Sequence, residues 1–107
     1  MQIATWNVNS LNVRLPQVLE WLQANPVDVL GLQELKLTDD KFPHDAFEAA
    51  GYQSVCFGQK TYNGVALITK KPVDEVVRNI PLHEDEQARV IAGTVATEPG
   101  PLRVINC

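Results

Sequence analysis

The sequence predicts an α/β protein whose mixed sheet begins with a β-strand, α-helix, β-strand unit. Residues 2–8 alternate apolar and polar side chains, residues 15–24 repeat apolar side chains at helical spacing, and residues 27–33 form a nearly continuous apolar run. These three patterns indicate a half-buried strand, an amphipathic helix and a strand buried on both faces. A unit of this kind places its two strands parallel and side by side, with a right-handed crossover.

Turn-forming residues set the bounds of this first unit. The short polar side chains of residues 9–12 are typical of a loop after the first strand. Leu15-Pro16 predicts the start of the helix, because proline is tolerated in a first turn, where its missing N–H costs nothing. The helix is expected to run to about Ala24 and to stop before Asn25-Pro26.

The rest of the chain is predicted to be mainly antiparallel. A polar loop over residues 36–42 leads to a short helix that begins at Pro43 and that Gly51 closes. The dipeptide Asn63-Gly64 is typical of a hairpin. Pro99-Gly100 fits the central positions of a type II turn. The strands expected here are residues 52–58, 65–69, 73–79, 89–97 and 102–107, the last of them in the middle of a sheet.

Length and composition indicate one globular domain. No stretch approaches the roughly 18 uncharged apolar residues of a membrane span, and the start of the chain lacks the pattern of a secretory signal. Cys56 and Cys107 have no metal-binding spacing, which favours two reduced thiols in a cytoplasmic protein. The net charge of −4 argues against a general nucleic-acid-coating role.

Polar side chains end both strands of the predicted unit. Asn7 ends the first and Glu34 follows the second, so the two are expected at the same edge of the sheet, where open α/β sheets bind ligands. Mg²⁺ prefers oxygen ligands and is typically held by one or two carboxylates, water and substrate phosphate. We therefore predict half of a metal-dependent phosphodiesterase site. The alternative is a solvated strand-end Glu34 beside a turn-forming Asn7.

Other candidates are weaker. Arg89 can clamp a phosphate with two hydrogen bonds, or it can pair with the acidic residues 84–86. His44 and His83 are interpreted as surface histidines. The two serines have no evident base, which argues against a serine nucleophile.

Four short motifs occur in order along the chain: Thr5–Leu11, Gly31–Lys36, Gly58–Lys60 leading to Gly64–Ala66, and Arg89–Ile91. In order and spacing they resemble the exonuclease III family of apurinic/apyrimidinic endonucleases, and the resemblance covers the whole chain. It implies a four-layer α/β sandwich of the deoxyribonuclease I type, of which this chain is the N-terminal half. The implied activity is cleavage of double-stranded DNA at abasic sites and trimming of 3′ ends, with Mg²⁺ or Mn²⁺.

The same resemblance assigns individual residues. Glu34 corresponds to a metal ligand, and Asn7 supports the metal or the scissile phosphate. Ser10 and Asn12 replace a common glycine and an often basic residue, which moves phosphate contacts toward Arg14. Tyr62 is expected to pack on the sugar-phosphate. The positions assigned to the DNA backbone are Arg14, Lys36, Lys60, Tyr62, Asn63 and Arg89.

The resemblance assigns no catalytic residue to the chain. The groups with which the family activates water follow the position of Cys107, so residues 1–107 are interpreted as a partial domain, apparently truncated at the C-terminus and inactive alone. Such a part is expected to be marginally stable or prone to aggregate unless the other half is supplied. Two alternatives stay open: an inositol-polyphosphate phosphatase or sphingomyelinase, and a non-catalytic α/β module.

Overall fold

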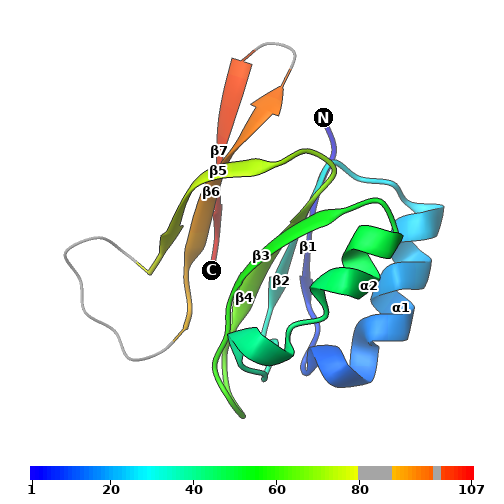
Figure 1. Cartoon of the computed structure of the whole chain (residues 1–107), viewed down its shortest axis with the longest axis vertical. Coiled ribbons are helices and arrows are strands. Elements are labelled where there is room, and N and C mark those ends of the chain that lie inside the picture. The colour runs from blue at the N-terminus through cyan, green and yellow to red at the C-terminus, as the bar shows by residue number, and fades with distance from the viewer. Residues whose placement is uncertain (80–87, 98–99) are drawn as a thin grey trace.

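The computed structural model describes residues 1–79, 88–97 and 100–107, and its elements form three layers (Figure 1). A four-stranded sheet lies in the middle, with helices on one face and a three-stranded sheet on the other. In order of pairing, the first sheet contains β1 (Ile3–Asn7), β2 (Val29–Gln33), β4 (Val65–Thr69) and β3 (Gln53–Phe57). The second contains β5 (Val73–Arg78), β6 (Ile91–Thr97) and β7 (Gly100–Asn106). The helices are α1 (Leu11–Ala24), η1 (Asp39–Lys41) and α2 (His44–Ala49).

The predicted β-strand, α-helix, β-strand unit is confirmed. β1 and β2 pair in parallel, with Asn7 opposite Gln33, and α1 connects them. Ala4 and Trp6 pack on the core, and the alternate side chains of β1, those of Ile3, Thr5 and Asn7, are exposed, as the alternation predicts. β2 is buried over its first four residues, as expected for a strand that is covered on both faces.

The prediction that the first helix opens at Leu15 is wrong, because α1 begins one turn earlier. Leu11 is fully buried, and its N–H donates to the carbonyl oxygen of Leu35 at 3.0 Å. The N–H of Arg14 donates to the Ser10 carbonyl at 3.2 Å and closes the first turn. Pro16 therefore lies inside the helix. Tertiary burial of Leu11 outweighs the local preference of proline for a first turn.

The elements after β2 follow the prediction with one addition. The 3₁₀ helix η1 lies inside the expected polar loop. α2 ends before Gly51, whose φ of 89° fits the predicted glycine closure. β3 and β4 form the predicted hairpin, and Asn63 and Gly64 in its loop have φ values of 54° and 96°. Antiparallel pairing of β5, β6 and β7 is also as expected.

Within the described segments the last strand, β7, lies at the edge of the second sheet and pairs with β6 alone. Its place in the middle of a sheet stays a prediction. Its side chains alternate between half-buried and exposed up to Asn106, which is the pattern of a strand covered on one face only. Pro99 of the expected type II turn lies outside the described residues.

Two apolar cores hold the layers together. One joins the helices to the first sheet through residues such as Leu22, Leu30 and Phe47. The other joins the two sheets, where Val29 and Leu67 meet Ile91 and Val95. No helix in the described part of the chain is long and apolar enough to cross a membrane.

Candidate active site

The predicted meeting of Asn7 and Glu34 is confirmed. The side-chain amide of Asn7 donates a hydrogen bond to Oε2 of Glu34. The backbone N–H of Asn9 donates to Oδ1 of Asn7 at 3.1 Å, which fixes the orientation of the Asn7 amide. One Glu34 oxygen is thus held by the protein, at the end of two parallel strands.

The backbone around Glu34 has positive φ angles, which residues other than glycine rarely adopt. Glu34 itself has a φ of 55°. Hydrogen bonds hold this segment on both sides: the N–H of Ser10 donates to the Glu34 carbonyl at 2.9 Å, and the N–H of Leu35 donates to the Gly64 carbonyl at 3.2 Å. Strained positions gather where function requires them. Positive φ values also occur at Asn9, Ser10, Lys36 and Asn63.

A pocket of about 480 Å³ opens beside this pair, and Asn7, Glu34, Asn63 and Arg89 line it. The structure therefore brings together four of the eight residues predicted for the site, from four separate segments of the chain. The acidic partners considered for Arg89, residues 84–86, lie outside the described residues.

The side chain of Gln59 connects two walls of the pocket, a role that the sequence analysis missed. Its Oε1 accepts a hydrogen bond from Nδ2 of Asn63 at 3.3 Å and another from the N–H of Ala88 at 2.8 Å. Ala88 in turn accepts from the N–H of Gly64 at 2.9 Å. These contacts place Arg89 beside the hairpin loop. The only signal in the sequence was the position of Gln59 within the Gly58–Lys60 motif.

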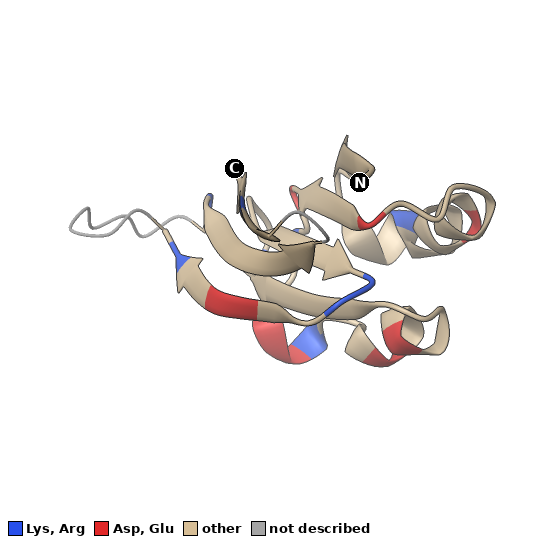
Figure 2. Ribbon diagram, turned by 90° about the horizontal axis from the view of Figure 1, so that it is seen from above, with Lys and Arg blue, Asp and Glu red and all other residues tan. Residues whose placement is uncertain are grey.

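The other four predicted DNA contacts do not line the pocket. Lys36 is half-buried, and its ammonium donates to Oδ1 of Asn9. Lys60 and Tyr62 are exposed on the hairpin loop, and Arg14 is half-buried on α1. Figure 2 shows lysine and arginine on several separate segments and not along one helix. A polyanion would therefore be contacted by loops and strand ends.

The donor atoms at the pocket fit a magnesium-like ion. In the described part of the chain, no three or more His, Cys, Asp and Glu side chains are arranged to hold a metal. Glu34 offers one carboxylate beside an open pocket, and the Asn7 amide holds one of its oxygens. Mg²⁺ suits such a site, because it retains water and completes its octahedron with substrate phosphate.

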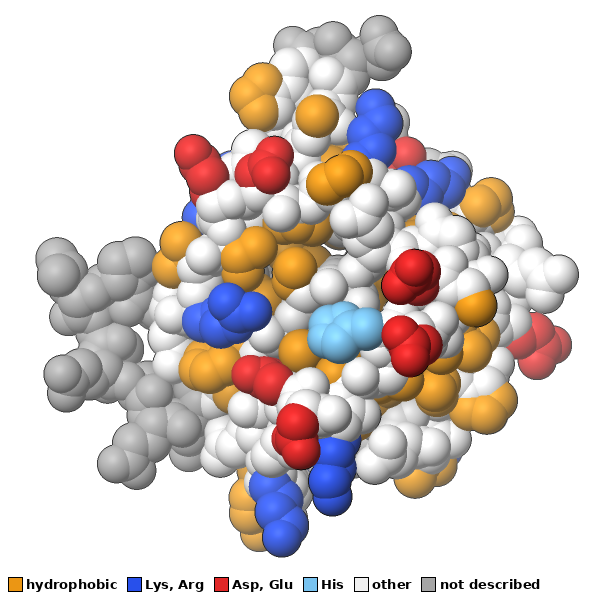
Figure 3. All heavy atoms as spheres, in the orientation of Figure 1, with side chains coloured by type: hydrophobic (Ala, Val, Ile, Leu, Met, Phe, Trp, Pro, Cys, Tyr) orange, Lys and Arg blue, Asp and Glu red, His pale blue; other side chains and the backbone are white. Residues whose placement is uncertain are grey.

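The interpretation of Ser54 as a serine without a base is corrected. Nδ1 of His44 lies 2.6 Å from Oγ of Ser54, and Nε2 of His44 lies 3.9 Å from Sγ of Cys56. Figure 3 shows this face, with the histidine in pale blue. His83 lies outside the described residues. Spacing along the sequence could not reveal the contact, because the packing of α2 on β3 brings His44 to Ser54.

The two cysteines are free thiols with opposite environments. Cys56 is buried and Cys107 is exposed. Burial, with the carboxylate of Asp39 close to the sulfur, raises the pKa of Cys56 to about 12. The thiolate is the reactive form. From pH 9 to pH 12 the unfolded chain loses the Cys56 proton before the folded chain does, so the free energy of unfolding falls across this range.

We expect one thiol to react in the native chain and two in the denatured chain. At pH 8, a pKa near 12 in place of the ordinary 9.0 leaves Cys56 with about a thousandfold less thiolate. A disulfide reagent such as dithionitrobenzoate, followed by intact mass, counts the modified thiols. The Cys107→Ser variant is the control and should show no native reaction. Rapid native modification of that variant would contradict the buried position of Cys56.

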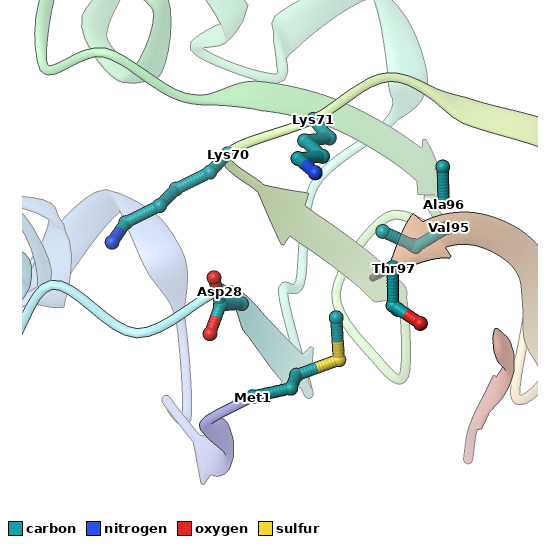
Figure 4. A pocket seen from close by; sticks show the side chains of 7 residues that line it. All are labelled: Met1, Asp28, Lys70, Lys71, Val95, Ala96 and Thr97. Carbon is teal, nitrogen blue, oxygen red and sulfur yellow. The ribbon is translucent and has the colours of Figure 1, made fainter. Parts of the chain in front are cut away.

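A second pocket, of about 210 Å³, lies at the opposite end of β2 (Figure 4). Asp28, which precedes this strand, lines the pocket together with Met1, Lys70 and Thr97. The N–H of Gln2 donates to the Asp28 carboxylate at 2.8 Å and lowers the pKa of this group. None of the predicted site residues lines this pocket, so the Glu34 end of the sheet is the candidate site.

Comparisons with known proteins identify the family of the chain. A family model described as the endonuclease/exonuclease/phosphatase family matches residues 4–105. Exodeoxyribonuclease III of Haemophilus influenzae is 39% identical over 107 residues, which are 99% of this chain and 40% of that protein. The chain thus spans about 40% of the length of this curated relative.

Solved structures match closely over the same part. A 3′-5′ exonuclease from Neisseria meningitidis is 54% identical with a TM-score of 0.90, over 98% of this chain and 40% of that one. A Neisseria 3′ phosphatase bound to a product DNA hairpin is 54% identical with a TM-score of 0.91, also over 98% of this chain and 40% of that one. An AP endonuclease from Archaeoglobus fulgidus is 36% identical with a TM-score of 0.86, over 90% of this chain and 37% of that one.

Proposed function

Because this chain belongs to the endonuclease/exonuclease/phosphatase family, we propose that it forms the metal-holding N-terminal part of a DNA-repair nuclease of the exonuclease III type. The observation that carries the proposal is the contact between Asn7 and Glu34 at the mouth of a pocket that Arg89 also lines. This arrangement combines a carboxylate for a divalent cation with a guanidinium for a phosphate.

Each residue at the pocket has a part in the proposal. Glu34 holds Mg²⁺ or Mn²⁺, and the Asn7 amide orients the carboxylate and supports the metal or the scissile phosphate. When bound, the ion polarises a phosphoryl oxygen as a Lewis acid. Arg89 and Asn63 contact the phosphate from the opposite wall. The proposed DNA-backbone contacts outside the pocket are Arg14, Lys36, Lys60 and Tyr62.

We propose double-stranded DNA with abasic sites or 3′ ends as the substrate. Contacts from cations and amides on loops hold a duplex by its backbone and do not read its sequence, which suits an enzyme that recognises a lesion. The names of the similar proteins point the same way: one is an AP endonuclease, and another is bound to a product DNA hairpin. The proposed compartment is the cytoplasm.

Full activity requires residues beyond those described. A general base must lie within hydrogen-bond reach of the attacking water. Asn7 cannot serve as this base, because an amide does not accept a proton at neutral pH, and Glu34 is assigned to the metal. The proposal therefore places water activation in the additional 60% or so of the fold that the relatives possess.

A hybrid enzyme tests the proposal. Residues 1–107 are joined to the part of the N. meningitidis exonuclease that follows the matched region, and cleavage is measured on duplexes with an abasic site or a recessed 3′ end. We expect cleavage in Mg²⁺ or Mn²⁺ and none in a chelator. Hydrolysis of inositol phosphates or sphingomyelin, without cleavage of DNA, would refute the assignment in favour of another branch of the family.

A further inference from the structure

Asn106 is a buried polar residue whose side-chain amide forms hydrogen bonds with other residues of the protein. It lies near the end of β7 and is 6% exposed. Its Nδ2 donates to the Leu32 carbonyl at 2.9 Å and to the Ala66 carbonyl at 2.7 Å. Its Oδ1 accepts from Nε2 of Gln33 at 2.6 Å. A buried amide is stabilised when all these bonds form and is costly when they do not.

These bonds connect the two sheets at the end where the site lies. Leu32 and Gln33 belong to β2 and Ala66 to β4, whereas Asn106 belongs to β7 of the second sheet. Gln33 directly precedes Glu34. Its Nε2 also lies 2.7 Å from Oγ1 of Thr5, two residues before Asn7. The Asn106 amide thus holds the end of β2 directly and reaches β1 through the side chain of Gln33.

The packing around Asn106 depends on a glycine. A Cβ atom at Gly31 would lie 3.0 Å from Cγ of Asn106 and 3.1 Å from its Oδ1. Gly31 has no positive φ, so its role here is space and not backbone freedom. The absence of a side chain in the middle of a buried strand allows the amide to approach β2.

We propose that Asn106 is a positioning residue for the metal site: it holds the ends of β1 and β2 so that Asn7 and Glu34 face one ion. The inference rests on the proposed function of those two residues. Loss of the Asn106 amide leaves the Leu32 and Ala66 carbonyls without this donor and frees the Gln33 side chain. Groups that orient metal ligands typically account for about 10–100-fold in metal affinity, and we expect an effect of this size.

The matched control is Thr69, the other buried polar residue in the described part of the chain. Its Oγ1 donates to the Lys71 carbonyl at 2.6 Å, at the opposite end of β4 from the site. Thr69→Val also removes one buried hydrogen bond, and it keeps the volume of the side chain. A general loss of stability would follow from both variants, but a displaced metal site only from Asn106→Ala.

The test is hydrogen–deuterium exchange of the 107-residue chain, read by mass spectrometry at micromolar concentration with and without Mg²⁺. In Asn106→Ala we expect about tenfold faster exchange of residues 3–9 and 29–36. The Mg²⁺ concentration that half-protects these segments should rise at least about tenfold. Thr69→Val should speed exchange no more in these segments than in the rest of the chain, and it should leave the half-protecting Mg²⁺ concentration unchanged. Unchanged exchange in Asn106→Ala, with Mg²⁺ protecting the parent chain, overturns the inference.

A second variant covers the case in which Asn106→Ala does not fold. Gly31→Ala keeps every hydrogen-bonding group, and the atoms nearest to its new Cβ belong to the Asn106 amide, so it should weaken Mg²⁺ protection in the same way. Where both variants fold, Gly31→Ala should add no further effect to Asn106→Ala, because its neighbour is gone. Full additivity contradicts the inference. Absence of Mg²⁺ protection in the parent chain contradicts instead the proposed metal site.

Discussion

Replacing Glu34 by glutamine in the hybrid enzyme is expected to lower metal-dependent DNA cleavage by at least about 100-fold. Glutamine keeps the size of the side chain and an oxygen that can accept from Asn7, but it removes the charge that holds a divalent cation. Loss of residues that only orient metal ligands costs about 10–100-fold, so loss of a ligand should cost at least as much. Cleavage rates over a Mg²⁺ titration measure the effect.

The control for this experiment is Glu20→Gln, which removes the same charge from an exposed position on α1. It should leave the cleavage rate and its Mg²⁺ dependence unchanged. Circular dichroism checks that both variants keep the fold. If Glu34→Gln retained most of the activity at every Mg²⁺ concentration, Glu34 would be a solvated strand-end carboxylate and the metal would be held elsewhere.

The 107-residue chain alone is expected to show no cleavage and to self-associate as its concentration rises. β1 and β7 are edge strands in the described structure, and Ile3 and Ile105 on them are 54% and 68% exposed. Unpaired edges with apolar side chains pair with other chains. The expected result is an apparent mass that increases with concentration in light scattering, and DNA cleavage below detection in Mg²⁺.

Lysine substitutions identify the surface responsible. Ile3→Lys together with Ile105→Lys should suppress self-association, because charged side chains protect sheet edges. The control is Val13→Lys, which changes an apolar residue that is 61% exposed on α1. This variant should self-associate as the parent chain does. A monodisperse parent chain at high concentration would contradict the prediction. Cleavage by the isolated chain would show that its own residues can activate water.

The meeting of Asn7 and Glu34 could be predicted because it depends on few assumptions. Once two apolar segments are identified as parallel neighbours, their carboxyl ends must lie together. The hairpin at Asn63-Gly64 could be predicted for a similar reason, since its turn residues have backbone requirements of their own. Local chemistry is sufficient in both cases.

Other features depend on contacts between distant parts of the chain. The start of α1 follows from the burial of Leu11 under residues that come after β2, and no local pattern includes this contact. The contact of His44 with Ser54 follows from the packing of α2 on β3. Asn106 resembles any polar residue at the end of a strand until the two sheets are packed. Tertiary contacts override local preference at all three positions.

The long sequence separation between Asn106 and its hydrogen-bond partners also sets the order in which parts of the fold form during synthesis. Its bonds to the Leu32 and Ala66 carbonyls span 74 and 40 residues. A ribosome adds about 5–20 residues per second, so Leu32 and Ala66 are made seconds before Asn106. During that interval the inner apolar face of β2 and β4 has no second sheet to cover it. The nascent chain should therefore be a chaperone client at least until β7 emerges, when the Asn106 bonds form and the second sheet covers this face in the same late step.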